Sequence, residues 1–170
     1  MEKHPNFLTS RPLWAAILNC FVTTSRSECL VENRTNMALP NLKCLIAREN
    51  LHQIGTLFFL HGEGYTAESS RKLLKSLLHR EFEFDHLRVI YPQAPDIVYR
   101  VASGGEDKGM WYERNTLSPT DWEKIDSINH SCTLISQLIN LEKSRGIPLQ
   151  NIIVGGFGMG GIIAMHTAYR

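Results

Sequence analysis

Three short apolar runs alternating with helix-forming segments constrain the fold of this 170-residue chain more than any other feature. The runs at 56–60, 87–91 and 151–154 are largely apolar and lack the strict alternation of a strand with one face in water. Such runs are typical of strands covered on both faces, as in parallel sheets. Between them, 66–80 and 125–139 carry apolar residues at helical spacing. This order predicts an α/β fold with an open parallel sheet and flanking helices.

Other local signals predict where elements begin and end. The segment 44–47 (CLIA) is consistent with a short edge strand. Residues 118–121 (SPTD) have the composition of a helix start, with serine as the cap and proline in the first turn. Gly146 and Pro148 predict the end of that helix, and a last helix is expected to begin near Gly161.

Composition and charge argue against several classes of protein. The chain is 43% hydrophobic, with 18 Lys and Arg against 17 Asp and Glu. These proportions are those of a globular domain and not of collagenous, disordered or disulfide-scaffold chains. No basic stripe is present to follow a phosphate backbone, so nucleic acid is not an expected partner. No apolar run approaches the roughly 20 residues of a membrane helix, so no transmembrane segment is expected.

The first part of the chain differs from the rest. Residues 1–42 are predicted to be an irregular N-terminal extension, and 43–170 form the domain proper. Within the extension, Leu13–Val22 is an apolar run flanked by basic and small residues, which is the outline of a secretory signal. Glu2, Pro12 and Asn19 weaken that outline, and cleavage after residue 25 would leave an odd number of cysteines. Secretion through residues 1–25 is therefore the weaker alternative for location.

The glycine-rich segment 155–161 follows the third strand and supports two interpretations. Gly156, Gly158 and Gly161 fit the dinucleotide fingerprint G-x-G-x-x-G, but the required acidic residue about 20 positions further on is not present. The residues 156–160 (GFGMG) also fit the nucleophile elbow G-x-S-x-G, a sharp strand-to-helix turn that exposes a serine hydroxyl. Every position of that elbow fits except the centre, where Gly158 replaces the serine.

Four segments together resemble a known family. In chain order they read FFLHGEG, VIYPQAP, GGEDKGMWYE and IIVGGFGMGGIIAMHTAYR. Their order and spacing are similar to those of the acyl-protein thioesterases and lysophospholipase-like carboxylesterases. The lysophospholipase-like branch, whose elbow reads GGFSMGG, is the most similar. The resemblance extends from Lys43 to Arg170, and residues 1–42 resemble nothing in that family.

The resemblance implies an α/β-hydrolase fold, a cytoplasmic location, and hydrolysis of short-chain carboxylic esters or palmitoyl thioesters without a metal or cofactor. It places the oxyanion-binding N–H groups on Glu63 and Met159, and Trp111 near the substrate cleft. His61, Gly62 and Gly64 would support the oxyanion loop, while Gly156 and Gly160 would shape the elbow. The implied ligand is a fatty-acyl ester or thioester, and no protein partner is implied.

Two departures from the family affect the chemistry. Gly158 has no side chain to attack a carbonyl, and the acid and histidine that follow the serine in this family are not present within the 170 residues. The sequence therefore predicts a catalytically inactive form. The alternatives are an acyl-binding pseudoenzyme and a non-functional splice or gene-model fragment. The strand at 151–154 would then be an open sheet edge.

Other reactive side chains have ordinary structural explanations. His61 is expected to brace the glycine-rich loop by hydrogen bonding rather than to act in catalysis. His166 and Cys132 are expected to pack on helices, and Ser69 and Ser70 to satisfy a helix N-terminus. Trp111 and Tyr112 are as consistent with core packing as with walls of a cleft. Four basic residues are expected to form a solvated face of the first helix and not a binding patch: Arg71, Lys72, Lys75 and Arg80.

Overall fold

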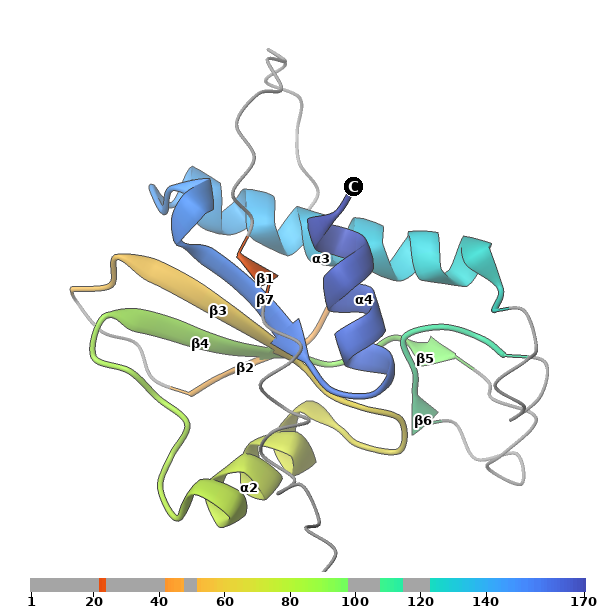
Figure 1. The fold of residues 1–170 in the computed structure, drawn as a ribbon, viewed down its shortest axis with the longest axis horizontal. Coiled ribbons are helices and arrows are strands. Elements are labelled where there is room, and N and C mark those ends of the chain that lie inside the picture. Colours follow the sequence, from red (N-terminus) through yellow and green to blue (C-terminus); the bar gives the residue numbers. More distant parts are fainter. Residues whose placement is uncertain (1–21, 24–41, 48–51, 98–107, 115–122) are drawn as a thin grey trace, which may run out of the picture.

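The computed structural model describes residues 22–23, 42–47, 52–97, 108–114 and 123–170. Within these ranges, no helix is both long and apolar enough to cross a bilayer. The elements form a sheet with helices on its two faces (Figure 1). The predicted helix start at 118–121 and the motif residues 104–107 lie outside these ranges.

The main sheet has five strands in the order β1-β7-β3-β4-β2. Its centre is parallel and consists of β7 (Ile152–Gly156), β3 (Gly55–Leu60) and β4 (Leu87–Pro92). The edge strand β2 (Cys44–Ile46) pairs antiparallel with β4, with Leu45 opposite Tyr91. The predicted strands and the short edge strand are confirmed, but the sheet is mixed and not wholly parallel. The parallel centre depends on the helical crossovers, whereas a short edge segment can pair in either direction.

The other edge of the sheet corrects the prediction of an open strand. Strand β1 (Val22–Thr23) pairs antiparallel with β7, placing Val22 opposite Val154 and Thr23 opposite Ile153. The sequence contains no strand pattern at these positions, because a two-residue ladder is too short to produce a detectable periodicity. This pairing satisfies part of an edge that would otherwise offer its backbone groups to another chain.

Alternate residues of β3 point into two separate cores, which explains why the run 56–60 is apolar throughout. Phe58 and Leu60 pack with the helices α3 (Ile125–Ser144) and α4 (Met159–Ala168). Leu57 and Phe59 pack on the opposite face, against α2 (Ala67–Leu78). Figure 1 shows α2 on one side of the sheet and α3 with α4 on the other. The prediction of a sheet covered on both faces is confirmed.

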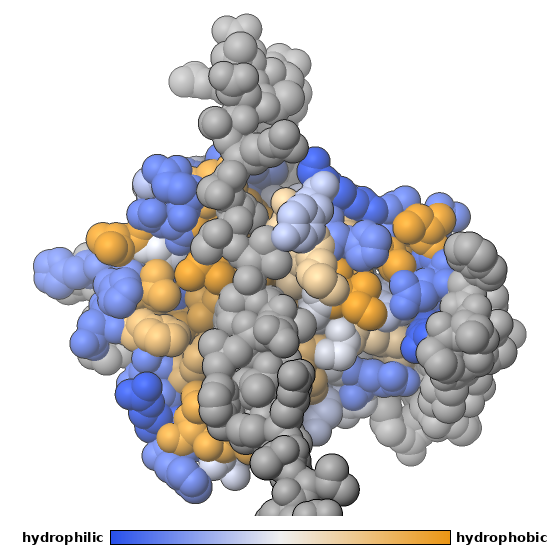
Figure 2. All heavy atoms as spheres, viewed as in Figure 1, coloured by the Kyte–Doolittle hydropathy of each residue, from blue (hydrophilic) through white to orange (hydrophobic). Residues whose placement is uncertain are grey.

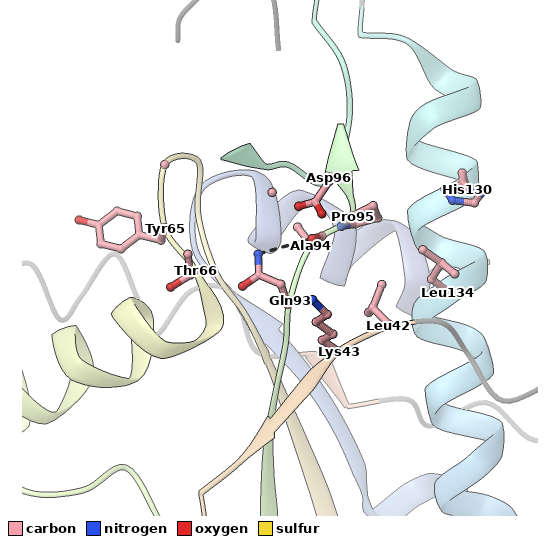
Figure 3. A pocket seen from close by; sticks show the side chains of 12 residues that line it. Leu42, Lys43, Tyr65, Thr66, Gln93, Ala94, Pro95, Asp96, His130 and Leu134 are labelled. Atoms are coloured by element: carbon pink, nitrogen blue, oxygen red, sulfur yellow. Dashed lines mark hydrogen bonds between the residues drawn. The ribbon is translucent and has the colours of Figure 1, made fainter. Parts of the chain in front are cut away.

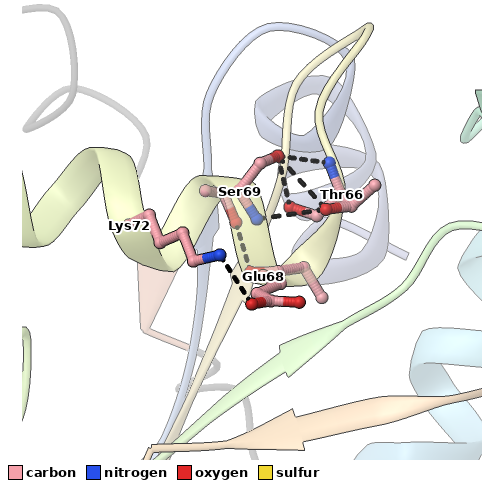
Figure 4. Close-up of polar contacts among 6 residues, drawn as sticks. Thr66, Glu68, Ser69 and Lys72 are labelled. Carbon is pink, nitrogen blue, oxygen red and sulfur yellow. Dashed lines mark hydrogen bonds and ion pairs between the residues drawn. The ribbon is translucent and has the colours of Figure 1, made fainter.

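The helix ends follow local chemistry. Thr66 caps α2, and its hydroxyl and that of Ser69 accept hydrogen bonds from each other's backbone N–H in a reciprocal capping box (Figure 4). Helix α3 begins at Ile125 after the non-helical Lys124, several residues later than the SPTD segment predicts. Its end at Ser144 agrees with the prediction, since Gly146 takes a φ of 93°.

A buried carboxylate joins α3 to the sheet. Glu142 is 2% exposed, and its Oε2 accepts a hydrogen bond of 2.7 Å from the Thr56 hydroxyl on β3. Its Oε1 is bonded to the guanidinium groups of Arg145, at 2.7 Å, and Arg88, at 3.4 Å. A buried carboxylate is tolerated when it is paired and hydrogen-bonded in this way. The contact fixes α3 against the start of β3 and β4.

Small elements at both ends of the central strands complete the fold. Strands β5 (Asp96–Ile97) and β6 (Lys108–Gly109) form a separate antiparallel ladder, and a 3-10 turn, η1 (Leu149–Asn151), leads into β7. Figure 2 shows apolar and polar side chains interspersed on one face of the molecule. The most exposed large apolar residues of the described chain are distributed over several elements: Ile54, Leu77, Leu78, Ile125, Met165 and Tyr169.

Candidate active site

The turn between β7 and α4 has the shape of a nucleophile elbow. Gly158 sits at its tip with φ 55° and ψ −129°, immediately before the first residue of α4, and is exposed. A Cβ on Gly156 or on Gly160 would lie 2.4 Å from the carbonyl oxygen of Leu60. Both positions therefore require glycine, because β3 runs too close for a side chain.

The central position of this turn has room for a side chain. A Cβ on Gly158 would lie 3.5 Å from the Cα of Gly62 and 3.9 Å from the backbone nitrogen of Glu63, which are ordinary contact distances. The positive φ, and not crowding, is what favours glycine here. A side chain at 158 would therefore start beside the loop that follows β3.

That loop, 61–64, is held close to the elbow. Its Gly62 packs under the ring of Phe157, since a Cβ there would be 2.5 Å from the ring. The N–H of Tyr65 donates to the carbonyl of Gly62 at 3.2 Å, and Gly64 takes a φ of 74°. The rings of Tyr65 and Phe157 meet edge to face with their centroids 5.1 Å apart. The two glycine-rich segments therefore meet at the carboxyl ends of β3 and β7, where ligands bind in open α/β sheets.

His61 is fully buried and connects this loop to the segment that follows β4. Its Nε2 accepts a hydrogen bond of 3.0 Å from the N–H of Ala94. Its Nδ1 lies 2.9 Å from the carbonyl oxygen of Gly62, so this nitrogen carries the proton and donates. Burial lowers the pKa of the imidazole and so favours this neutral form. Both ring nitrogens are engaged with the backbone, which is the geometry of a brace.

Trp111 lies beneath the same loop and is fully buried. Its indole N–H donates to the carbonyl oxygen of His61 at 2.8 Å, and the two rings are 5.3 Å apart. The carbonyl of Trp111 in turn accepts a hydrogen bond from the hydroxyl of Ser131 on α3. The neighbouring Tyr112 is also buried and donates to Glu123, and burial raises the pKa of its phenol. These aromatic residues belong to the core, and Trp111 positions the loop from within that core.

Residues 42–170 match the model of the phospholipase/carboxylesterase family. The chain belongs to this family.

Two curated relatives and one solved structure illustrate the relationship. Lysophospholipase-like protein 1 of Mus musculus is 37% identical over 128 residues, which are 75% of this chain and 53% of the mouse protein. Acyl-protein thioesterase 1 of Saccharomyces cerevisiae is 31% identical over 116 residues, 66% of this chain and 50% of the yeast protein. The chain thus spans about half the length of these relatives. The crystal structure of Zea mays acyl-protein thioesterase 2 superposes with a TM-score of 0.57 at 23% identity, covering 74% of this chain and 50% of the maize chain. This likeness shows that the fold is that of an α/β hydrolase.

The remaining sequence candidates lie apart from the elbow turn. Cys132 is buried in α3, and His166 is half-buried on α4. Ser69 belongs to the capping box, and Ser70 donates to the carbonyl of Ala67. The basic residues of α2 face acidic neighbours in three ion pairs: Lys72 with Glu68, and Arg71 and Lys75 with Glu81. Among the described residues, no group of three or more His, Cys, Asp or Glu side chains could hold a metal ion.

Sequence reasoning missed how the loop is supported. It identified His61 as a brace but not its partner, the N–H of Ala94, nor the bond from Trp111 to the His61 carbonyl. These contacts join residues 33 and 50 positions apart, so no local pattern encodes them. One signal could have indicated the contact between His61 and Ala94. The segment 92–95 directly follows a buried strand, so it is expected at the same edge of the sheet as His61.

Proposed function

We propose that this chain is a non-catalytic member of the phospholipase/carboxylesterase family that binds an acyl ester or thioester at the elbow. The observation that carries the proposal is Gly158, which occupies the elbow tip beside the loop 61–64 without offering a nucleophile. A cytoplasmic location follows from the family resemblance and is part of the same proposal.

The backbone around Gly158 supports carbonyl binding. The N–H of Met159 opens α4, where the first N–H groups of a helix have no partner within the helix. The backbone nitrogen of Glu63 lies near the same space. Two N–H groups directed at one point are what an acyl carbonyl oxygen needs, and in an active hydrolase they stabilise the oxyanion that forms there. Here they would hold the carbonyl without a covalent step.

His61 does not replace the missing chemistry. Its two ring nitrogens are both hydrogen-bonded to the backbone and the side chain is fully buried. A general base must reach the proton that it abstracts, within about 3 Å or through one water. An engaged and buried imidazole cannot do so without breaking the contacts that hold the loop.

The first experiment measures hydrolysis by the purified 170-residue chain, with p-nitrophenyl acetate and a palmitoyl thioester as substrates. The wild-type chain and Gly158→Ser should both fail to exceed the buffer rate, because the variant restores a hydroxyl while His61, the imidazole of the neighbouring loop, stays buried and hydrogen-bonded to the backbone. A relative that carries the elbow serine serves as the positive control. Turnover by the wild-type chain, or robust turnover by Gly158→Ser, would contradict the non-catalytic assignment.

The second experiment tests acyl binding with a matched pair of variants at Met159. Met159→Pro removes the N–H at the first position of α4, where proline is well tolerated, and Met159→Ala truncates the same side chain but keeps the N–H. A fluorescent fatty-acyl ester should bind the proline variant about 2- to 10-fold more weakly than the alanine variant. Equal affinities for the two variants, or no saturable binding by the wild-type chain, would remove the binding role.

A further inference from the structure

A cavity borders the segment that follows β3. It has a volume of about 750 Å³ and is formed by the start of β2, the loops after β3 and β4, strand β6 and helix α3 (Figure 3). It includes Gly64 and Tyr65 but neither Gly158 nor Met159. The cavity therefore shares one loop with the candidate active site and is otherwise separate from it. Its size falls in the range of cavities that bind small molecules, about 300–1,000 Å³.

The walls of this cavity are joined by hydrogen bonds centred on Gln93. Its N–H donates to the carbonyl oxygen of Lys43 at 2.8 Å, which ties the start of β2 to the end of β4. Its side-chain Oε1 accepts from the N–H of Ala67 at 2.9 Å, which ties in the start of α2. A Cβ on Gly109 of β6 would lie 2.3 Å from the Gln93 amide nitrogen. The segments are thus connected before any ligand arrives, which lowers the cost of binding.

The lining combines an apolar side with two opposite charges. Leu42 and Leu134 are half-buried and lie on the side of α3, and Pro95 contributes further apolar surface. Lys43 and Asp96 line the same cavity from different segments, and both are exposed. Within the described part of the chain, neither of these two side chains forms an ion pair. Each charge is therefore available to a ligand group of the opposite sign.

We propose that this cavity binds a zwitterionic aliphatic molecule of about dipeptide size. Its carboxylate would pair with the Lys43 ammonium, its ammonium with the Asp96 carboxylate, and its aliphatic part would pack on Leu42, Leu134 and Pro95. A purely anionic ligand would bring its charge close to Asp96, and a purely cationic one close to Lys43, so the zwitterion is preferred over either. The proposal uses no residue of the elbow and stands independently of acyl binding.

Three matched probes test it by calorimetric titration of the full chain: leucyl-leucine, its N-acetyl derivative and its C-terminal amide. The two derivatives each remove one charge and keep the aliphatic side chains. Leucyl-leucine should bind saturably, and each derivative should bind about two- to fivefold more weakly, the range of exposed ion pairs. Absence of saturable binding by leucyl-leucine, or equal affinity for all three probes, would overturn the proposal.

Two charge-removing variants assign the ends of the ligand. Lys43→Ala should abolish the preference for leucyl-leucine over its amide, and Asp96→Asn the preference over its acetyl derivative. Both side chains are exposed, so the variants should fold, which an unchanged melting temperature verifies. Lys72→Ala on α2 and Asp126→Asn on α3 are the matched controls, because both residues are exposed and lie outside the cavity. Unchanged preferences in Lys43→Ala and Asp96→Asn would place the probe elsewhere and contradict the proposal.

Discussion

The two glycine-rich loops at the candidate site keep their shapes by opposite means. The loop after β3 is held by side-chain hydrogen bonds, chiefly those of the buried His61. The turn after β7 is held by the absence of side chains, because Gly156 and Gly160 lie against the backbone of β3. The conformation of the first loop therefore depends on side-chain hydrogen bonds, and that of the second on the close approach of two backbone segments.

This difference explains why the turn after β7 keeps its shape with no side chain at position 158. A side chain at 158 would take no part in the close packing of the turn, since its Cβ would make only ordinary contacts. The supporting residues, by contrast, are buried or crowded. The residues that shape the turn are therefore Gly156 and Gly160, and a change at position 158 can leave that shape intact.

The largest effect is expected from Gly160→Ala. The added Cβ would lie 2.4 Å from the Leu60 oxygen and 2.5 Å from the His61 oxygen, so β3 or α4 must shift. We expect a loss of about 3 kcal/mol or more in the free energy of unfolding, measured by urea denaturation. A loss below about 1 kcal/mol would show that close backbone packing does not hold the turn.

Next in size is His61→Ala, which tests the side-chain support of the other loop. It leaves the N–H of Ala94 and the carbonyl of Gly62 without their partner in a buried region. We expect a loss of about 2–3 kcal/mol in the same measurement. His130→Ala on the exposed surface of α3 is the control and should change stability by less than about 0.5 kcal/mol. Equal effects of the two variants would mean that His61 is not a brace.

Gly158→Ala isolates backbone strain from crowding. The residue has φ 55° and ψ −129°, a conformation that costs an L-residue about 1–3 kcal/mol, while the space around it is open. The loss should therefore be about 1–2 kcal/mol and smaller than that of Gly160→Ala. A loss as large as that of Gly160→Ala would contradict the assignment of strain and crowding to different positions.

The smallest effect concerns pH and again involves His61. Because burial lowers the pKa of the folded imidazole, the unfolded chain binds a proton first as the pH falls below about 6.5. This contribution to stability is complete above that pH and is lost as the pH falls through the folded pKa, with a slope of at most about 1.4 kcal/mol per pH unit. Denaturation at several pH values should show this slope in the wild-type chain and a smaller one in His61→Gln. An identical slope in both would exclude His61 as its source.

The elements that could be predicted from sequence are those with strong local signals. The run TLFFL, the helical stripe after Thr66 and the glycine pattern at 156–160 each appear in the structure close to the predicted positions. Helix α3 begins at Ile125, later than the cap composition of 118–121 predicts, and those four residues lie outside the described ranges. The pairing of Val22 and Thr23 with β7 was missed because two residues carry no periodicity.

The amino-acid sequence alone determined the family, the order of the central strands and the helices, and the glycine at the centre of the elbow pattern, Gly158, because these depend on residue identity and local spacing. Only the tertiary structure decided that β1 and β2 pair antiparallel with the parallel core, that Ala94 and Trp111 hold His61, and that Glu142 joins α3 to β3. It also decided that Lys43 and Asp96 line one cavity. Each of these depends on contacts between residues far apart in the chain, whose partners are chosen by packing and not by neighbouring sequence.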